Sequence, residues 1–230
     1  MRKRIIYFTL GSLILGLAAM QVPFSAVLGG SQQTFSLFDF IAPSFGGFLG
    51  AGIGAIAAVI TKAANVIVHG GEFDTTTIIR LFPLAIGALY FGARRFKPLI
   101  ALIPLACIAL FLSHPEGRGA WYYSLYWLIP VVSLFVKRSV VFNSLGATFT
   151  AHAVGGVAFL YAFNLPSEVW IALIPVVFVE RMLFTSGIAV SYIILNSLFA
   201  ALSHRPQLQW LKHLVREEHV LSPTFLQTRL

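Results

Sequence analysis

The sequence predicts an all-α membrane protein: a polytopic helix bundle with six transmembrane helices, or seven as the alternative. Of its 230 residues, 58% are hydrophobic and 10% are charged, whereas soluble domains have about 45–50% and about 25%. Apolar runs long enough to cross about 30 Å of hydrocarbon recur along the chain. We therefore expect one transmembrane bundle over residues 1–203 and a cytoplasmic, basic and amphipathic tail over residues 204–230.

Hydropathy marks seven candidate spans, at residues 5–22, 41–68, 77–92, 98–113, 121–136, 142–163 and 169–202. The first follows a basic N-terminus and resembles a signal peptide, but its length and the hydrophobic segments behind it favour a retained helix. The second and the last exceed a simple span, which implies tilt, a kink or a re-entrant piece, and Pro175 is the expected bend in the last. The other four are close to the length of single spans.

The charged loops predict the orientation of the bundle. Connections at 114–119 and 164–168 carry one Arg and no Lys, so they fit the outside of the cell membrane. Three basic segments belong in the cytoplasm by the positive-inside rule. These segments are residues 94–97, 137–138 and 205–216, and the basic residues 2–4 also belong inside.

The orientation contains a parity conflict near the N-terminus. If the basic N-terminus is inside, the runs at 5–22 and 41–68 return the chain to the wrong face before the next span. Either residues 23–75 contain an extra half-crossing, or one run does not span, or one loop breaks the charge rule. We favour six spans with both termini cytoplasmic.

Composition and motifs argue against several classes of function. The single cysteine, Cys107, cannot form an internal disulfide, a thiolate zinc site or an iron–sulfur cluster. The sequence has no HExxH, no GxSxG, no phosphate loop and no acidic cluster, so we expect no enzyme, no metal and no cofactor. The net charge of +8 is spread over loops and the tail, which indicates a lipid membrane and not nucleic acid as the partner.

Two sets of small residues predict close helix packing. Small side chains four residues apart let helix backbones approach in lipid, where van der Waals contact drives association. The stronger set is Gly46, Gly50, Gly54 and Ala58. Ser12 and Gly16 form a weaker set, which indicates either packing within the bundle or a docking face for another subunit.

The stretch from Pro23 to Asp39 combines amide and hydroxyl groups, among them Gln32 and Gln33, with phenylalanines such as Phe38. Such a mixture of uncharged polar groups and aromatic rings suits an uncharged planar ligand. The alternative is an interfacial loop whose Phe side chains rest among lipid headgroups.

Charged residues inside apolar runs face the protein interior, form pairs or mark function, because burying them in lipid is costly. We expect Lys62 and Arg80 to reach toward an interface. Glu180 and Arg181 are adjacent and diverge by about 100° around a helix, so we do not expect them to face one partner.

Two polar stripes follow from helical spacing. One contains Thr148, His152, Gly155 and Gly156, and the other contains Arg181, Thr185, Tyr192 and Asn196. Together they predict a cavity between the last two helices, although a buried histidine such as His152 is also typical of an interhelical hydrogen bond.

The segment from Phe38 to Val68 resembles the substrate-binding S components of energy-coupling factor (ECF) vitamin transporters, in particular the riboflavin-specific branch. The matching positions are Asp39, Pro43, Gly50, Gly54 and Lys62. The resemblance implies a six-helix bundle that binds a vitamin or similar micronutrient from outside, beneath a loop that follows the first helix. It also implies that small residues on the first helix, here Ser12 and Gly16, meet a transmembrane coupling subunit, which connects to two ATPase subunits.

We therefore expect a substrate-capture subunit of an ECF-type transporter in the cell membrane. One alternative is a structural or assembly protein that acts through helix packing with partner proteins. Another is an intramembrane enzyme or self-contained transporter that uses His152, Glu180 and Arg181. The expected ligand contacts are Gln32, Gln33, Phe38, Asp39, His152, Arg181, Thr185 and Tyr192.

Overall fold

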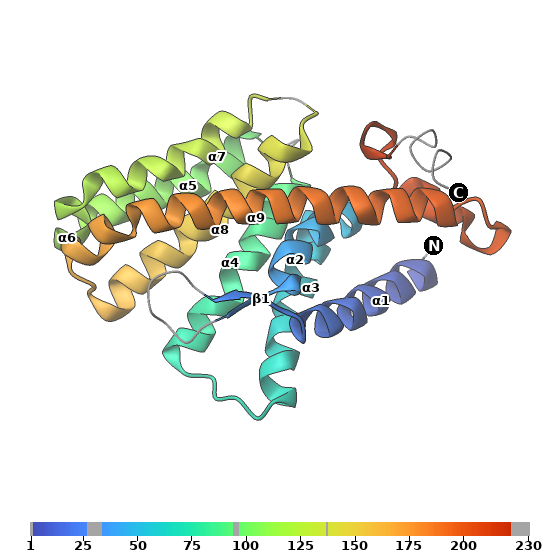
Figure 1. Cartoon of the computed structure of the whole chain (residues 1–230), viewed down its shortest axis with the longest axis horizontal. Coiled ribbons are helices and arrows are strands. Elements are labelled where there is room, and N and C mark those ends of the chain that lie inside the picture. The colour runs from blue at the N-terminus through green and yellow to red at the C-terminus, as the bar shows by residue number, and fades with distance from the viewer. Residues whose placement is uncertain (1, 27–33, 94–96, 137, 222–230) are drawn as a thin grey trace.

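The computed structural model describes residues 2–26, 34–93, 97–136 and 138–221, and its helices pack into one bundle (Figure 1). The all-α bundle predicted from the sequence is confirmed. A short antiparallel hairpin of β1 (Pro23–Ala26) and β2 (Thr34–Ser36) accompanies the helices. The α-helices are α1 (Arg2–Met20), α2 (Leu37–Leu49), α3 (Ala51–Val68), α4 (Thr75–Gly92), α5 (Lys97–Ser113), α6 (Pro115–Gly119), α7 (Leu128–Ser133), α8 (Val140–Phe163) and α9 (Ser167–Leu202). The 3-10 helices are η2 (Trp121–Trp127), η3 (Pro206–His213) and η4 (Glu217–His219).

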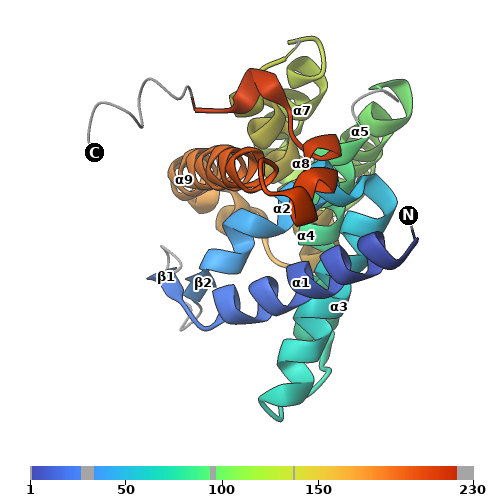
Figure 2. The ribbon, with the colours of Figure 1, turned by 90° about the vertical axis from the view of Figure 1, so that its right-hand side faces the viewer.

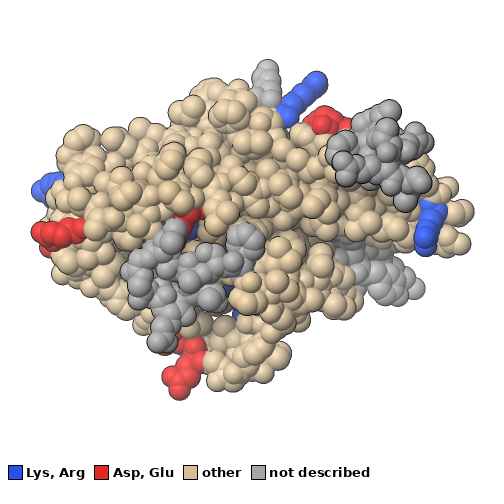
Figure 3. Space-filling view, viewed as in Figure 1, with Lys and Arg blue, Asp and Glu red and all other residues tan. Residues whose placement is uncertain are grey.

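Within the described residues, four helices are long and apolar enough to cross a membrane. These are α3, α4, α8 and α9, and shorter apolar helices lie at Thr9–Met20, Leu37–Leu49 and Pro98–Ser113. Many large apolar side chains on their outer faces are exposed, as Ile56 and Ile60 are on α3, and such surfaces suit contact with lipid. Figure 3 shows a broad uncharged surface between charged groups that lie mainly at the periphery. These features support a membrane protein, and the number of spans stays a prediction.

The long run at 41–68 is two helices that meet at Gly50. The φ angle of Gly50 is +87°, which favours glycine and ends the regular helix. The turn lies beside the last residue of α4, because a Cβ on Gly92 would come within 2.8 Å of the Ala51 nitrogen. Two helices in place of one agree with an extra half-crossing, one of the three solutions to the parity conflict, and the number of crossings stays a prediction.

Gly50 is therefore not part of a packing stripe. It is exposed, and a Cβ there would meet nothing within 4 Å. Gly46 does lie against the Ala88 backbone in α4, and Gly54 lies against Gly46 across the α2–α3 junction. Ala58 is fully buried in the core among α1, α2, α3 and α4. Gly50 is needed at this turn for its positive φ angle and not for its small size.

The first helix crosses α3, as Figure 2 shows. Ser12 is 8% exposed, and a Cβ on Gly16 would come within 2.7 Å of the Thr61 methyl group and 3.0 Å of the Phe38 ring. In this structure the two residues pack inside the bundle, which is the first of the two alternatives. Docking of another subunit on them would require α1 to leave α3.

The last apolar run forms one long helix, whereas the run at 121–136 does not. Helix α9 continues through Pro175 for 36 residues, about 54 Å at helical rise, and extends along the molecule (Figure 1). The run at 121–136 is instead divided between η2 and α7. Aromatic side chains of η2, above all Tyr123 and Trp127, fill the core between α5, α8 and α9, and this packing prevails over a regular helix.

Long-range contacts tie together the loops that share a predicted side of the membrane. The backbone N–H and hydroxyl of Ser167 donate to the Glu116 carboxylate at 2.7 and 2.9 Å, which joins the two connections expected outside. At the other end, Arg138 and Arg216 line one small cavity, and Asn196 of α9 binds the backbone of Arg216 through both amide atoms. The tail thus folds back on α9 as two 3-10 helices.

Candidate ligand-binding site

A cavity of about 750 Å³ lies inside the bundle, where α8 and α9 face α2, α3 and α4, and where β2 and η2 complete the wall. Small-molecule sites are typically about 300–1,000 Å³, so the cavity has room for a small organic ligand. Apolar and aromatic side chains form much of its lining. The ionisable side chains that line it are Asp39, Lys62, Arg80, Tyr123, His152, Glu180 and Arg181.

Asp39 and Lys62 join α2 to α3 at the cavity wall. The Lys62 Nζ lies 3.8 Å from the Asp39 Oδ1. The other carboxylate oxygen accepts hydrogen bonds from the backbone N–H and the hydroxyl of Ser36, at 2.7 and 3.0 Å, and so holds the start of α2. Lys62 and Arg80 both line the cavity, and the expectation that they reach toward an interface stays a prediction. The cavity offers them polar surroundings without the need to leave the bundle.

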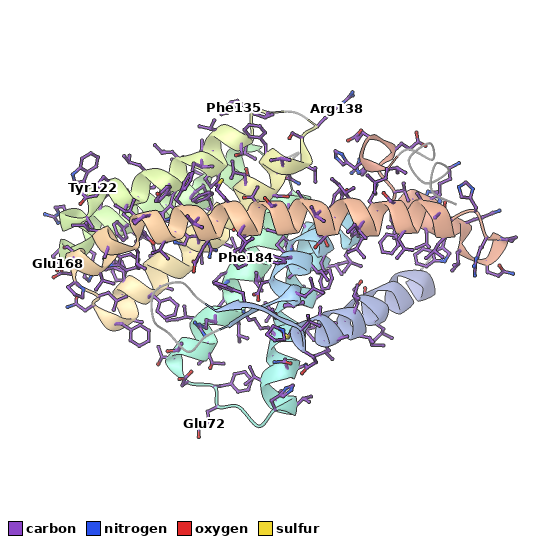
Figure 4. All side chains as sticks on the ribbon, viewed as in Figure 1. Glu72, Tyr122, Phe135, Arg138, Glu168 and Phe184 are labelled. Atoms are coloured by element: carbon purple, nitrogen blue, oxygen red, sulfur yellow. The ribbon has the colours of Figure 1, made fainter. Side chains whose placement is uncertain are left out.

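Glu180 and Arg181 both line the cavity and pair with each other. The Arg181 Nη2 lies 3.3 Å from the Glu180 Oε2. The expectation that these neighbours cannot face one partner is therefore wrong, because a long guanidinium side chain bends across the angle that separates their Cβ atoms. Arg181 also lies over the ring of Phe184, with its Cζ 4.4 Å from the ring centroid. Phe184 is labelled near the middle of α9 in Figure 4.

His152 on α8 is held by two aromatic residues of η2. The Trp127 Nε1–H donates to the His152 Nδ1 at 3.1 Å, and the His152 Nε2 lies 2.9 Å from the Tyr123 hydroxyl oxygen. An indole nitrogen can only donate, so the His152 Nδ1 carries no proton. The imidazole is thus neutral with its proton on Nε2, and this N–H donates to Tyr123.

The small residues of the α8 stripe make room for this arrangement. A Cβ on Gly156 would come within 3.0 Å of the Trp127 ring, and a Cβ on Gly155 would contact Pro83 of α4 at 3.4 Å. Thr148, one turn before His152, is 3% exposed, and its hydroxyl has no hydrogen-bond partner among the described residues. The α8 stripe and Arg181 of the α9 stripe line the same cavity.

Three of the predicted ligand contacts, Asp39, His152 and Arg181, line the cavity. Gln32 and Gln33 lie outside the described residues, but Phe35 and Ser36 of the same predicted loop belong to the wall. Phe38, Thr185 and Tyr192 do not line it.

Each of these three side chains has a different place. Phe38 is fully buried and packs edge-to-face on Phe45, because its side of α2 faces α1 and α3. The Thr185 hydroxyl donates to the Arg181 carbonyl oxygen within α9. Tyr192 stacks on Phe48 and lines a second cavity of about 230 Å³. Of the predicted stripe from Arg181 to Asn196, only Arg181 lines the large cavity, although Ile188, further along α9, lines it as well.

Tyr123 and Trp127 are the residues that sequence reasoning missed. Tyr123 and Trp127 sit in an aromatic run that is typical of a membrane span, and nothing in its spacing distinguishes a donor to His152 from a core ring. One sequence feature could have indicated them: Gly155 and Gly156 lie close to His152, and two adjacent glycines on a helix leave room for a bulky side chain from a neighbouring element.

The geometry suits non-covalent binding. Among the described residues, no group of three or more His, Cys, Asp or Glu side chains is placed to hold a metal ion. Comparison of the chain with protein-family models, curated proteins and solved structures gives no significant match.

Proposed function

We propose that the chain is a membrane-embedded substrate-capture subunit that binds a small organic molecule in the cavity between α8, α9 and the α2–α4 helices. The observation that carries the proposal is the lining of this cavity: charged and hydrogen-bonding side chains from α2, α3, α4, η2, α8 and α9 converge there, inside helices that are otherwise apolar. Burying these groups is costly in a membrane protein and is typical of a substrate site.

The partners follow from the resemblance to S components of ECF vitamin transporters. The sequence contains no phosphate-binding loop, so uptake would be driven by separate ATPase subunits through a transmembrane coupling subunit. The ligand would be a vitamin or a related micronutrient. The Glu116–Ser167 end would face outside, and the basic loops and both termini would face the cytoplasm of the cell.

Native mass spectrometry of the chain, purified in mild detergent from a host grown in rich medium, tests capture. The wild type should carry a stoichiometric small molecule, or acquire one on incubation with yeast extract. Arg181→Gln and His152→Gln should lose it. Arg205→Gln is the matched control, because Arg205 is exposed and lies beyond α9.

Two results would contradict capture. One is a wild-type chain that stays free of small molecules after incubation, and the other is a bound molecule that both cavity variants retain. A ligand-free chain that co-purifies with envelope proteins would favour the alternative of a structural or assembly protein.

A further inference from the structure

The hydroxyl proton of Tyr123 is available to a ligand. Because the His152 Nε2–H donates to the Tyr123 oxygen, the phenol cannot use its own proton in that hydrogen bond. No other hydrogen bond of this hydroxyl is formed with a described residue. Tyr123 is 1% exposed and lines the cavity. A buried donor without an acceptor is costly, so a ligand that supplies the acceptor is favoured.

Two more unpartnered polar atoms lie in the same wall. The Nε of Arg181 and the hydroxyl of Thr148 are buried, and neither has a hydrogen-bond partner among the described residues. A guanidinium can only donate. Arg181, Tyr123 and His152 all line this cavity.

The charges of the lining favour an anion. Three basic side chains, Lys62, Arg80 and Arg181, oppose two acidic ones, Asp39 and Glu180, and His152 is neutral. Lys62 and Arg181 are each paired with a carboxylate. Within the described part of the chain, no carboxylate lies within 4.0 Å of the Arg80 guanidinium. A ligand with one negative charge would balance the site.

We propose that the ligand of this cavity is an organic anion with a carboxylate or similar acceptor group, to which Tyr123 and the Arg181 Nε donate hydrogen bonds and whose charge balances Arg80. Trp127 is a positioning residue, because its indole N–H fixes the His152 tautomer and thereby leaves the Tyr123 proton free for the ligand. This inference rests on the proposed function and adds the chemical class of the substrate.

The direction of the hydrogen bonds can be measured without a ligand. In protein labelled with ¹⁵N-histidine, NMR should show the His152 ring protonated at Nε2 and unprotonated at Nδ1, with His152→Gln identifying the signal. Trp127→Phe should remove the hydrogen bond that keeps the His152 Nδ1 unprotonated, so that signal from an Nδ1-protonated ring appears. Trp121→Phe is the control, because Trp121 is 55% exposed in the same 3-10 helix. A wild-type His152 that carries its proton on Nδ1 would overturn the assignment.

The ligand class is tested with yeast extract separated by ion exchange into anionic, neutral and cationic small-molecule fractions. Each fraction is incubated with the purified full chain, and adducts are counted by native mass spectrometry. The anionic fraction should supply the adduct. Tyr123→Phe should weaken its binding about tenfold to a hundredfold, because a hydrogen bond to a charged group is lost. Tyr122→Phe, the exposed neighbour, should bind like the wild type.

The outcomes separate this inference from the proposed function. An adduct from the neutral or cationic fraction, or an anion that Tyr123→Phe binds as well as the wild type, would overturn the ligand class while leaving capture intact. No adduct from any fraction would contradict capture itself and the inference with it. If Tyr123→Phe fails to fold, Trp127→Phe should show the same loss of binding with the phenol still present.

Discussion

Gly46 of α2 lies against the backbone of Ala88 in α4 so closely that a methyl group on Gly46 would overlap the Ala88 carbonyl oxygen. Gly92, one turn further along α4, approaches the Gly46 carbonyl in the same way. Backbone contact of this kind brings α2 and α4 together at the end of the molecule where Gly50 turns the chain. The position of Asp39 and Pro43 in the cavity wall depends on it, since both belong to α2.

Gly46→Ala should therefore destabilise the protein by about 1–3 kcal/mol, the usual cost of overpacking. Thermal unfolding in detergent measures the loss. Gly52→Ala is the control, because Gly52 is exposed in α3 and a Cβ there meets nothing within 4 Å. It should leave stability unchanged or raise it slightly through helix propensity. Equal unfolding temperatures of the two variants would contradict the close contact.

Gly16→Leu should lower the unfolding temperature of the isolated chain, because a larger side chain would displace α1 from Thr61 and Phe38. Gly11→Leu should not, since a Cβ on Gly11 has open space around it. If Gly16→Leu leaves the isolated chain unchanged and only weakens a complex with a coupling subunit, then the face of α1 serves docking and not packing inside the bundle.

The Glu116–Ser167 contact should make stability depend on pH. Hydrogen bonds from the Ser167 hydroxyl and then from its backbone N–H lower the pKa of Glu116 below its ordinary 4.5. The ionised carboxylate therefore stabilises the fold above that value, and this contribution is lost as the pH falls through the lowered pKa.

Glu116→Gln is the variant that isolates this carboxylate. Its unfolding temperature should lie below that of the wild type at about pH 7, and the difference should shrink toward about pH 3. Glu168→Gln, on an exposed residue of the same region, should show a smaller pH-dependent difference. A difference between Glu116→Gln and the wild type that stays constant with pH would rule out the ionised contact.

Asn196→Ala should release the tail. Asn196 is fully buried and both receives and donates a hydrogen bond with the Arg216 backbone, at 2.8 and 2.9 Å. Loss of both bonds, worth about 1–3 kcal/mol together, should speed tryptic cleavage at Lys212 and Arg216 by about tenfold or more. Leu198→Ala changes an exposed neighbour on α9 and is the control. Unchanged cleavage in Asn196→Ala would show that other contacts hold the tail.

Much of the helical architecture follows from hydropathy, because spans longer than a bilayer leave a plain pattern in the sequence. The division of 41–68 into two helices does not, since Gly50 looks like its neighbours Gly46 and Gly54 until its φ angle is known. The parity of the charged loops indicated that something irregular lay in that region. The division of the run at 121–136 into two short helices could not be predicted either, because the packing of its aromatic rings depends on partners far away in the chain.

The candidate site was predictable where one helix carries the pattern. Thr148, His152, Gly155 and Gly156 share a face by spacing alone, and all line the cavity. On α9 only Arg181 of the predicted stripe lines the cavity, because spacing shows which residues share a face but not which of them border a cavity. Tyr123 and Trp127 depend on contacts across 29 and 25 residues, which no local pattern records.

An experimental density map of the full chain, purified from a host grown in rich medium, tests capture most directly. The account predicts density for a compact molecule between Tyr123 and Arg181, within hydrogen-bond distance of the phenol oxygen. Helices α8 and α9 closed on each other with no cavity, or a lipid acyl chain in its place, would contradict it.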